Sequence, residues 1–294
     1  MGRSPATTTF VEVADRVWVA RHEWYDVNVT LVAGGEGALL VDTLASEHAA
    51  AGLRDEVRRV LGTTPLVAVV DTHEHHDHVL GNATLLDAWP DALLVGHEEA
   101  ARRIPEVLPA QLARAVADGH PRAEEMAASR VLAPTTTFSL AHAVQLGDRL
   151  VEVVHPGRGH TGGDVVLRVA DADVVVAGDL VEAADDPGAA VPAYGDDSFP
   201  LEWPATVETV LGLVTPTTRV VPGHGPVVDR SFVLDQHGSL AALAAQVVDL
   251  AATGVGPDEA TAAGTWPFPV ERLGAAVARG YAALPPGARR LPLV

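Results

Sequence analysis

The segment THEHHDH, residues 72–78, constrains the fold most strongly, because it places four histidines and two acidic residues within seven positions. One residue, Asp71, separates it from the preceding apolar run PLVAVV, which is typical of a buried strand. On a helix, residues two apart point in nearly opposite directions, whereas in an extended segment they share one side. The spacing therefore favours an extended segment in which His73, His75 and Asp77 face one way. A turn after Asp77 would direct His78 toward a second, neighbouring position.

Residues of the same chemical types follow other apolar runs further along the chain. His160, Asp179 and His224 each come shortly after a separate Val-rich run. Gly or Pro stands beside each of them and lets the backbone turn tightly. Imidazole and carboxylate groups are common metal ligands. The sequence therefore predicts that several strand ends bring these side chains together around a pair of metal ions.

Predicted strands and helices follow one another in two successive halves of the chain. The Val-rich N-terminal region is interrupted by GGEG, which fits a hairpin turn, and residues 47–62 carry an apolar helical stripe. Pro204 opens another helix. Further strands are expected at residues 65–70, 149–154, 165–169, 173–177 and 219–221. Two sheets covered by helices are therefore expected, in a four-layer αββα sandwich of the α/β class.

Helical and loop segments complete this predicted core, and all of them are assigned to one domain spanning residues 1–294. Residues 97–130 favour a helical insertion of short helices broken at prolines. C-terminal helices are expected over about residues 232–294, at 232–252 and 268–284. The loop at 183–200 is longer than most connections. This loop and the insertion are candidates for a lid, with a plain structural role as the alternative.

Composition excludes several classes of function. Cysteine is absent, so the chain has no disulfides, thiolate metal ligands or thiol nucleophiles. The formal net charge of −19, without any basic run, argues against nucleic acid as a partner. No apolar run approaches the roughly 20 residues that span a bilayer, and the N-terminal segment lacks the apolar core of a secretion signal. We therefore expect a cytoplasmic protein that acts on a small molecule, with no membrane partner and an undetermined oligomeric state.

These motifs together resemble those of the metallo-β-lactamase superfamily, the αββα hydrolases that include glyoxalase II and many lactonases. The matching motifs occur in the family's order over roughly residues 10–230: VDT with Asp42, HEHHDH, GHTGGD with His160, GD with Asp179, and GHG with His224. The resemblance implies three sets of ligands: His73, His75 and His160 for a first metal; Asp77, His78 and His224 for a second; and Asp179 as a bridge. It also implies that Asp42 orients ligands without binding metal itself.

Nitrogen and carboxylate ligands suit two Zn²⁺ ions, although Mn²⁺ or Fe²⁺ can occupy the same groups. Zinc lowers the pKa of bound water from 15.7 to about 7, so a hydroxide bridging the two metals is the expected nucleophile. Asp77 would orient this hydroxide and pass its proton to the leaving group. The sequence thus predicts a binuclear zinc hydrolase that attacks the carbonyl of a small ester, thioester or lactone.

Other activities known in this family stay open as alternatives: an iron-dependent sulfur dioxygenase, a β-lactamase-like enzyme and a phosphodiester hydrolase. The absence of cysteine and the presence of Asp179 argue against lactam hydrolysis as the main activity. The acidic charge argues against phosphodiester cleavage. Glutathione thioesters are disfavoured too, because the segment WPFPVERLGAAVARGYAAL, residues 266–284, offers only two Arg in place of the basic cluster that glyoxalase II uses.

Several residues near the motifs are candidates for lining the substrate site, with ordinary packing or surface pairing as the alternative. These residues are Arg158, Tyr194, Phe199 and Trp203. Arg158 would meet either a substrate carboxylate or a surface acid. Glu74 and His76 alternate away from the metal-facing side, so supporting or surface positions are expected for both.

Overall fold

The computed structural model describes residues 9–285, and its strands form one continuous hydrogen-bonded path in the order β7-β6-β5-β4-β3-β12-β11-β10-β9-β8, with β2 beside β3 and β1 beside β2. The first half of this path forms one sheet and contains β1 (Val11–Ala14), β2 (Val17–His22), β3 (Val27–Ala33), β4 (Ala38–Val41), β5 (Leu66–Val70), β6 (Leu93–His97) and β7 (Thr136–Phe138). The second half forms the other sheet and contains β8 (Ala141–Gln145), β9 (Leu150–Val154), β10 (Val166–Val169), β11 (Val174–Glu182) and β12 (Arg219–His224).

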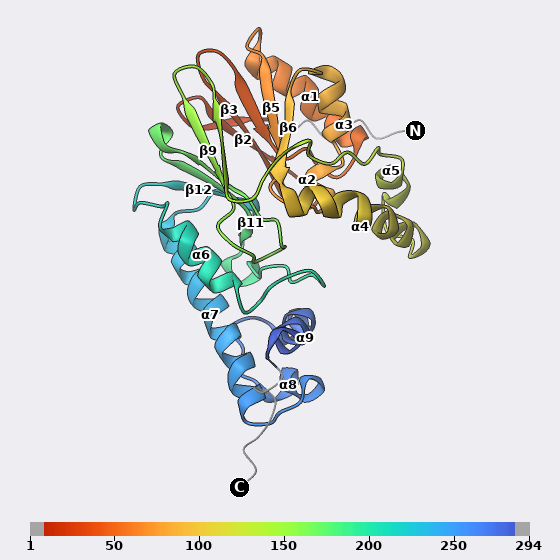
Figure 1. Cartoon of the computed structure of the whole chain (residues 1–294), viewed down its shortest axis with the longest axis vertical. Coiled ribbons are helices and arrows are strands. Elements are labelled where there is room, and N and C mark those ends of the chain that lie inside the picture. The colour runs from red at the N-terminus through yellow and green to blue at the C-terminus, as the bar shows by residue number, and fades with distance from the viewer. Residues whose placement is uncertain (1–8, 286–294) are drawn as a thin grey trace.

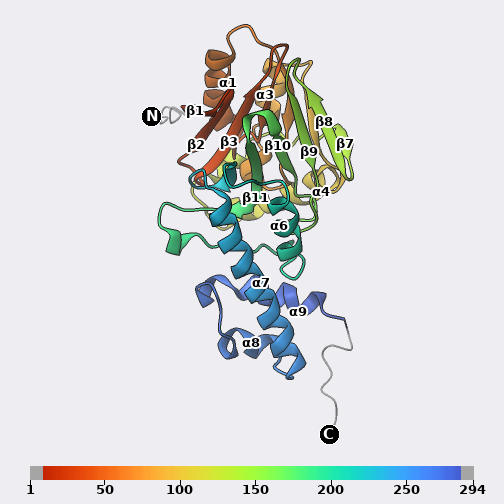
Figure 2. The same ribbon diagram turned by 90° about the vertical axis from the view of Figure 1, so that its left-hand side faces the viewer.

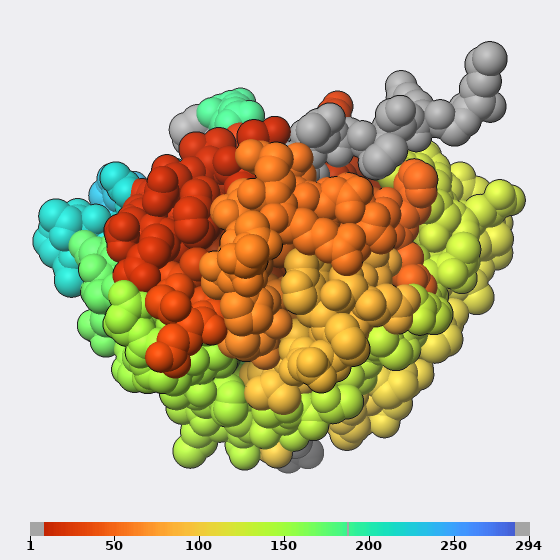
Figure 3. Space-filling view, turned by 90° about the horizontal axis from the view of Figure 1, so that it is seen from above, coloured from red at the N-terminus to blue at the C-terminus, as the bar shows by residue number. Residues whose placement is uncertain are grey.

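Two packed sheets arise because this path folds back on itself where β12 meets β3, through the antiparallel pair His224 and Val27. One apolar cluster lies between the halves and joins Val32, Val41 and Val70 to Val153 and Val176. Viewed from above, the red and orange residues of the first half lie directly alongside lime-green residues of the second (Figure 3).

Helices cover the outer face of each sheet. Helix α1 (Glu47–Leu61) and helix α3 (Asn82–Ala88) pack on the first half, through a cluster that contains Leu53, Val57 and Leu85. Helix α6 (Trp203–Leu211) and helix α7 (Arg230–Ala252) cover the second half, through a cluster that contains Val207 and Val233 (Figures 1 and 2). The prediction of a four-layer αββα sandwich is thereby confirmed.

Helix α1 illustrates how local sequence sets these elements. The hydroxyl of Ser46 accepts a hydrogen bond from the backbone N–H of Ala49 and caps the first turn. Leu53 and Val57 lie on its buried stripe, four residues apart. Gly62 ends the helix with φ 57°, a conformation that favours glycine. The observed bounds agree with the helix predicted at residues 47–62.

The insertion predicted as short broken helices contains one long helix, so that prediction is wrong. Helix α4 (Glu98–Ala117) includes Pro105 and Pro109 within its length, and the short helix α5 (Ala123–Ala127) follows it. Both prolines are exposed. On the opposite face, Ile104 and Leu108 are fully buried against Val79 and Leu80. The energy of this apolar contact offsets the hydrogen bonds that the prolines remove.

Replacement of Ile104 by alanine is expected to lower the free energy of unfolding of the protein. The side chain is fully buried, and removal of such a side chain costs about 2–5 kcal/mol of the free energy of unfolding. Urea denaturation measures the change directly. Val116 on the same helix is 42% exposed, so Val116→Ala should change stability by less than about 0.5 kcal/mol. Equal effects of the two substitutions would contradict the packing described for α4.

A separate group of helices closes the described chain. The long helix α7 extends beyond the sheets and packs at its far end with α8 (Pro257–Ala263) and α9 (Gly274–Ala283) (Figures 1 and 2). Leu243, Val247 and Tyr281 belong to the apolar cluster of this region. Helix α8 and strands β6, β7 and β8 were not expected from the sequence, and the end of the predicted C-terminal region lies outside the described residues. None of the described helices has the combination of length and apolarity required to cross a membrane.

Candidate metal centre and pocket

The histidine motif begins as an extended segment after β5 but turns earlier than predicted. Helix α2 (His76–Val79) starts at His76, whereas the turn was expected after Asp77. His75 is the last extended residue, with φ −75° and ψ 148°, and its carbonyl accepts a hydrogen bond from the N–H of His78. The early turn separates the motif into two parts. His73 and His75 remain on the extended part, while Asp77 and His78 lie on the helical turn.

The predicted ligands form two groups. Within each group, the potential ligand atoms all lie within 4.8 Å of one another. The first group contains His73, His75, His160 and Asp179, and the second contains Asp77, His78 and His224. Asp179 also contacts the second group. Its Oδ2 atom is 3.3 Å from His160 Nε2 and 3.1 Å from His224 Nε2, while its Oδ1 atom is 3.3 Å from His78 Nε2. This carboxylate therefore lies between the two groups.

Each histidine is oriented by a hydrogen bond on the ring nitrogen that faces away from the centre. Four of them use Nδ1 for this contact: His73 to Thr72 Oγ1 at 3.0 Å, His78 to Asp42 Oδ2 at 2.7 Å, His160 to Ala193 O at 3.0 Å, and His224 to Tyr25 O at 2.7 Å. His75 is reversed, because its Nε2 contacts Asp197 Oδ2 at 3.2 Å. The opposite nitrogen of each ring faces the centre, where it could act as a ligand.

The inward-facing atoms fit a pair of metal ions. His73 Nε2, His78 Nε2 and Asp179 Oδ1 are buried and form no hydrogen bond with any described residue. His75 Nδ1 and His160 Nε2 face each other at 2.8 Å. Each ring uses its other nitrogen for a hydrogen bond to the loop after β11, so these two facing atoms are the ones available to a metal ion once the proton between them is released. Nitrogen and carboxylate donors converging in this way suit Zn²⁺.

Burial and the neighbouring carboxylates shift the pKa values of these histidines in opposite directions. Burial lowers the pKa of His160 to about 4 and that of His73 well below its ordinary value, so both are neutral at pH 7. Burial also acts to lower the pKa of His78 and His224, but neighbouring carboxylates, chiefly Asp179, outweigh it. They raise the pKa of His224 to about 10 and that of His78 well above its ordinary value. At His75 the Asp197 carboxylate likewise outweighs burial and raises the pKa to about 9. Metal binding therefore requires these three rings to release a proton each.

Asp42 is a buried carboxylate that links the two ligand groups through hydrogen bonds. It follows β4 with φ 63°, and its side chain is buried. Its Oδ1 accepts a hydrogen bond from the N–H of Thr72 at 2.8 Å, and its Oδ2 accepts from Thr72 Oγ1 at 2.8 Å and from His78 Nδ1. Because Thr72 Oγ1 in turn contacts His73, one carboxylate orients a histidine from each group.

Gly223 is packed so closely against Asp179 that a larger residue is excluded. A Cβ atom at position 223 would lie 1.8 Å from Asp179 Oδ1. Gly223→Ala is therefore expected to displace this carboxylate and to lower kcat/KM by about 10²-fold, the cost of a misplacement of about 1 Å. Gly238→Ala is the control, because a Cβ atom there meets nothing within 4 Å. Unchanged kinetics in Gly223→Ala would show that Asp179 does not need its observed position.

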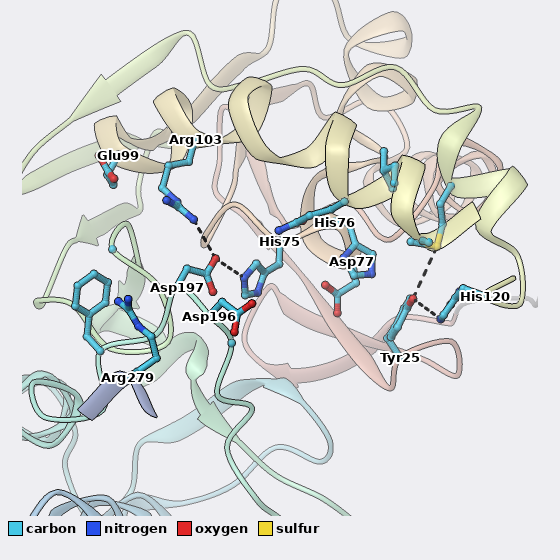
Figure 4. Close-up of a pocket in the computed structure, with 17 residues that line it drawn as sticks. Tyr25, His75, His76, Asp77, Glu99, Arg103, His120, Asp196, Asp197 and Arg279 are labelled. Carbon is cyan, nitrogen blue, oxygen red and sulfur yellow. Dashed lines mark hydrogen bonds and ion pairs between the residues drawn. The ribbon is translucent and has the colours of Figure 1, made fainter. Parts of the chain in front are cut away.

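A pocket of about 660 Å³ opens onto the ligand groups and is lined by His75 and Asp77. Helices α4 and α5 contribute Leu112 and Met126 to its wall, while the loop after β11 and helix α9 contribute Asp197 and Arg279 (Figure 4). An adjacent pocket of about 540 Å³ is lined by Asp179, His224, Glu182 and Tyr194. The segments predicted as a possible lid therefore form walls of the larger pocket.

The candidate lining residues occupy different environments. Tyr194 lines the smaller pocket and Phe199 lines the larger one. Arg158 pairs with the surface acid Glu202, with 2.7 Å between Nη2 and Oε1, which is the alternative expected for it. Trp203 is fully buried and packs edge-on against His160 with ring centroids 5.6 Å apart, so it does not line a pocket. Its indole ring packs against the imidazole of His160 from the apolar core.

The family model described as "Metallo-beta-lactamase superfamily" matches residues 22–231 of the chain. The chain belongs to this superfamily. The matched region contains every predicted ligand and ends at the start of α7, so the C-terminal helices lie beyond it. Metallo-beta-lactamase superfamily proteins are metal-dependent hydrolases, and this member carries two His and Asp groups that can hold metal.

Curated relatives come from two branches of the superfamily. A metallo-beta-lactamase type 2 of Bacillus cereus is 27% identical over 236 residues, which cover 78% of this chain and 80% of the relative. A hydroxyacylglutathione hydrolase of Synechococcus sp. (strain WH7803) is 37% identical over 71 residues, which cover 24% of this chain and 26% of the relative. The second similarity is therefore confined to a short region.

Two solved structures share the fold of this chain. The sec-alkylsulfatase Pisa1 from Pseudomonas sp. superposes with a TM-score of 0.75 at 17% identity, over 93% of this chain and 50% of the other. The metallo-beta-lactamase FIM-1 from Pseudomonas aeruginosa, in a mono-zinc form, superposes with a TM-score of 0.59 at 19% identity, over 81% of this chain and 96% of the other.

Three residues of this metallo-beta-lactamase superfamily site were not identified from the sequence. Asp197 contacts His75, and Arg103 contacts both Asp197 and Glu74. Glu182 is buried beside His160, and burial together with Asp179 raises its pKa to about 8. Asp197 and Arg103 lie in segments without periodic signals, far from the motif in sequence. Glu182, at the end of the strand that carries Asp179, is the one that the strand-end rule could have found.

Proposed function

We propose that the protein is a binuclear zinc hydrolase that attacks the carbonyl of a small ester, thioester or lactone. The observation that supports this proposal is the convergence of seven ligand-type side chains into two adjacent groups with Asp179 between them. His73, His75 and His160 would hold one ion, Asp77, His78 and His224 would hold the other, and Asp179 would contact both. When bound, such a metal pair activates water at neutral pH and polarises a carbonyl oxygen.

The chain's own residues would orient the substrate and move a proton. Asp77 lines both pockets, and its Oδ2 atom is 3.5 Å from His224 Nε2. This carboxylate is placed to orient the attacking water and to pass its proton to the leaving group. Tyr25, Leu112 and Phe199 give the larger pocket an apolar wall. That wall suits an uncharged acyl chain beside the reacting carbonyl.

A β-lactam is the second candidate substrate, because the Bacillus cereus relative aligned over most of this chain is a metallo-beta-lactamase. Two features favour a carbonyl ester over a lactam here. The chain has no cysteine to serve as the ligand that some β-lactamases use, and it has Asp179 between the two ligand groups.

Metal analysis combined with a hydrolysis panel tests the proposal. The panel contains an aryl ester, a lactone, a lactoyl thioester, a chromogenic cephalosporin and a phosphodiester. Two zinc ions per chain and turnover of one of the first three substrates are expected. Preferred turnover of the cephalosporin would support the second candidate, and one iron per chain without hydrolysis would favour a sulfur dioxygenase.

A further inference from the structure

Two histidines of the first ligand group are held by one loop, residues 183–202, between β11 and α6. The Nδ1 of His160 donates a hydrogen bond to the carbonyl of Ala193 at 3.0 Å, and the Nε2 of His75 donates to Asp197 Oδ2 at 3.2 Å. The side chains of His160 and Asp197 are mostly buried, with 3% and 14% of their surfaces exposed. The loop therefore determines the orientation of both rings.

The second ligand group does not depend on this loop for the orientation of its histidines. His78 contacts Asp42 after β4, and His224 contacts the carbonyl of Tyr25 between β2 and β3. Both partners lie in connections next to strands of the first sheet, far from the loop in sequence. A change at Asp197 should therefore affect the two groups unequally.

Asp197 is itself fixed by the inserted helix α4. Arg103 on this helix donates from Nη2 to Asp197 Oδ2 at 3.2 Å and from Nε to Glu74 Oε1 at 2.6 Å. Glu74 is fully buried and precedes His75 in the motif. Figure 4 shows Asp197 between Arg103 and His75, with a dashed contact to each. The helix, the loop and the motif are thus joined by charged hydrogen bonds.

Helix α9 holds the same turn of the loop from the other side. The N–H and the hydroxyl of Ser198 donate to the carbonyl of Gly195 at 3.1 and 2.8 Å, which closes a turn around Asp197. Arg279 on α9 donates from Nε to the carbonyl of Ser198 at 3.0 Å. Asp197 therefore sits on a turn that two helices from outside the sandwich hold in place.

We propose that Asp197 and Arg103 are positioning residues that align Nδ1 of His75 for one metal ion of the pair, the ion shared with His73 and His160. Neither residue would bind the metal. The inference rests on the proposed metal pair. A carboxylate that accepts a hydrogen bond from a ligating imidazole fixes the ring and raises its basicity, and its loss costs about 10- to 100-fold in metal affinity. Arg103 would act through Asp197 by holding the carboxylate in line with the ring.

Zinc titration of the metal-free, full-length protein tests this inference, with Zn²⁺ alone as the probe in calorimetry and in competition with a chelator. Asp197→Asn should weaken one of two binding steps by about 10- to 100-fold and leave the other within about twofold. Asp196→Asn is the matched control, because Asp196 lines the same pocket and is exposed. It should leave both steps unchanged.

Arg103 is tested against its neighbour Arg102, which pairs on the helix surface with Glu99 and Glu106. Arg103→Met should weaken the same binding step as Asp197→Asn, whereas Arg102→Met should not. The double variant Asp197→Asn with Arg103→Met should bind zinc no more weakly than Asp197→Asn alone. Urea unfolding of the metal-free variants shows whether each is folded. Asp197→Glu, which keeps the charge, should fall between the wild type and Asp197→Asn.

The outcomes separate this inference from the proposed function. If Asp197→Asn and Asp196→Asn titrate alike, or if both binding steps weaken equally in Asp197→Asn, the positioning role is refuted while the metal pair stands. If the wild type takes up two zinc ions and hydrolyses nothing in the panel, the proposed function alone fails. If the wild type takes up no zinc, both fail together.

Discussion

Asp179→Ala is expected to abolish hydrolysis and to leave the protein unable to hold two zinc ions. The carboxylate lies 3.1 Å from His224 Nε2 and 3.3 Å from both His160 Nε2 and His78 Nε2. Without it, two dications would face each other with less negative charge between them, at a separation where repulsion is strong. The loss of kcat/KM should exceed the roughly 10- to 100-fold that removal of a ligand's hydrogen-bonding partner costs.

Metal content and kinetics must be measured on the same preparation of this variant. Elemental analysis should give fewer than two zinc ions per chain, and addition of zinc should not restore turnover. Asp91→Ala serves as the control, because Asp91 is an exposed residue of the turn before β6. Full activity of Asp179→Ala with two zinc ions bound would refute the proposed role of this carboxylate.

The proposed ligands could be chosen from the sequence because each lies within or shortly after an apolar run that forms a buried strand. Strands β11 and β12 pair in parallel, so Asp179 on β11 and His224 at the end of β12 reach the same edge. Val-rich runs indicate such strands without any knowledge of their order in the sheet. The motif spacing then limits which side chains can face one point.

Other parts of the site depend on contacts that no local pattern reveals. His75 and Asp197 are 122 positions apart, and Arg103 reaches Asp197 across 94 positions. Glu74 alternates away from the metal-facing side, as expected, yet it is fully buried because Arg103 covers it. Alternation along a segment gives the direction of a side chain. It does not show which distant element packs over that side.

Local propensity also failed where tertiary packing outweighs it. The prolines of α4 predict breaks, but the buried face that contains Ile104 keeps the helix continuous. At the motif, the hydrogen bond from His78 Nδ1 to Asp42 accompanies an earlier turn than the extended pattern predicts. In both places the deciding partner lies in a different part of the chain.

Asp42→Ala is expected to reduce both stability and metal binding, although Asp42 is not among the proposed ligands. The substitution leaves the N–H and hydroxyl of Thr72 and the Nδ1 of His78 without their acceptor. Each buried group that loses its partner costs about 1–3 kcal/mol, so the free energy of unfolding should fall by about 3 kcal/mol or more. Zinc affinity should fall as well, because His73 and His78 both lose orientation.

Asp42→Asn separates these two effects. An amide that keeps its oxygen toward the Thr72 N–H preserves that hydrogen bond, but its NH₂ group cannot accept from Thr72 Oγ1 or from His78 Nδ1. The imidazole of His78 would then carry its proton on Nε2, the atom that faces the metal centre. Urea denaturation should show a smaller loss of stability than in Asp42→Ala, while zinc titration should show a comparable loss of affinity. If Asp42→Asn binds two zinc ions as tightly as the wild type, the orientation of His78 by Asp42 is not required for the site.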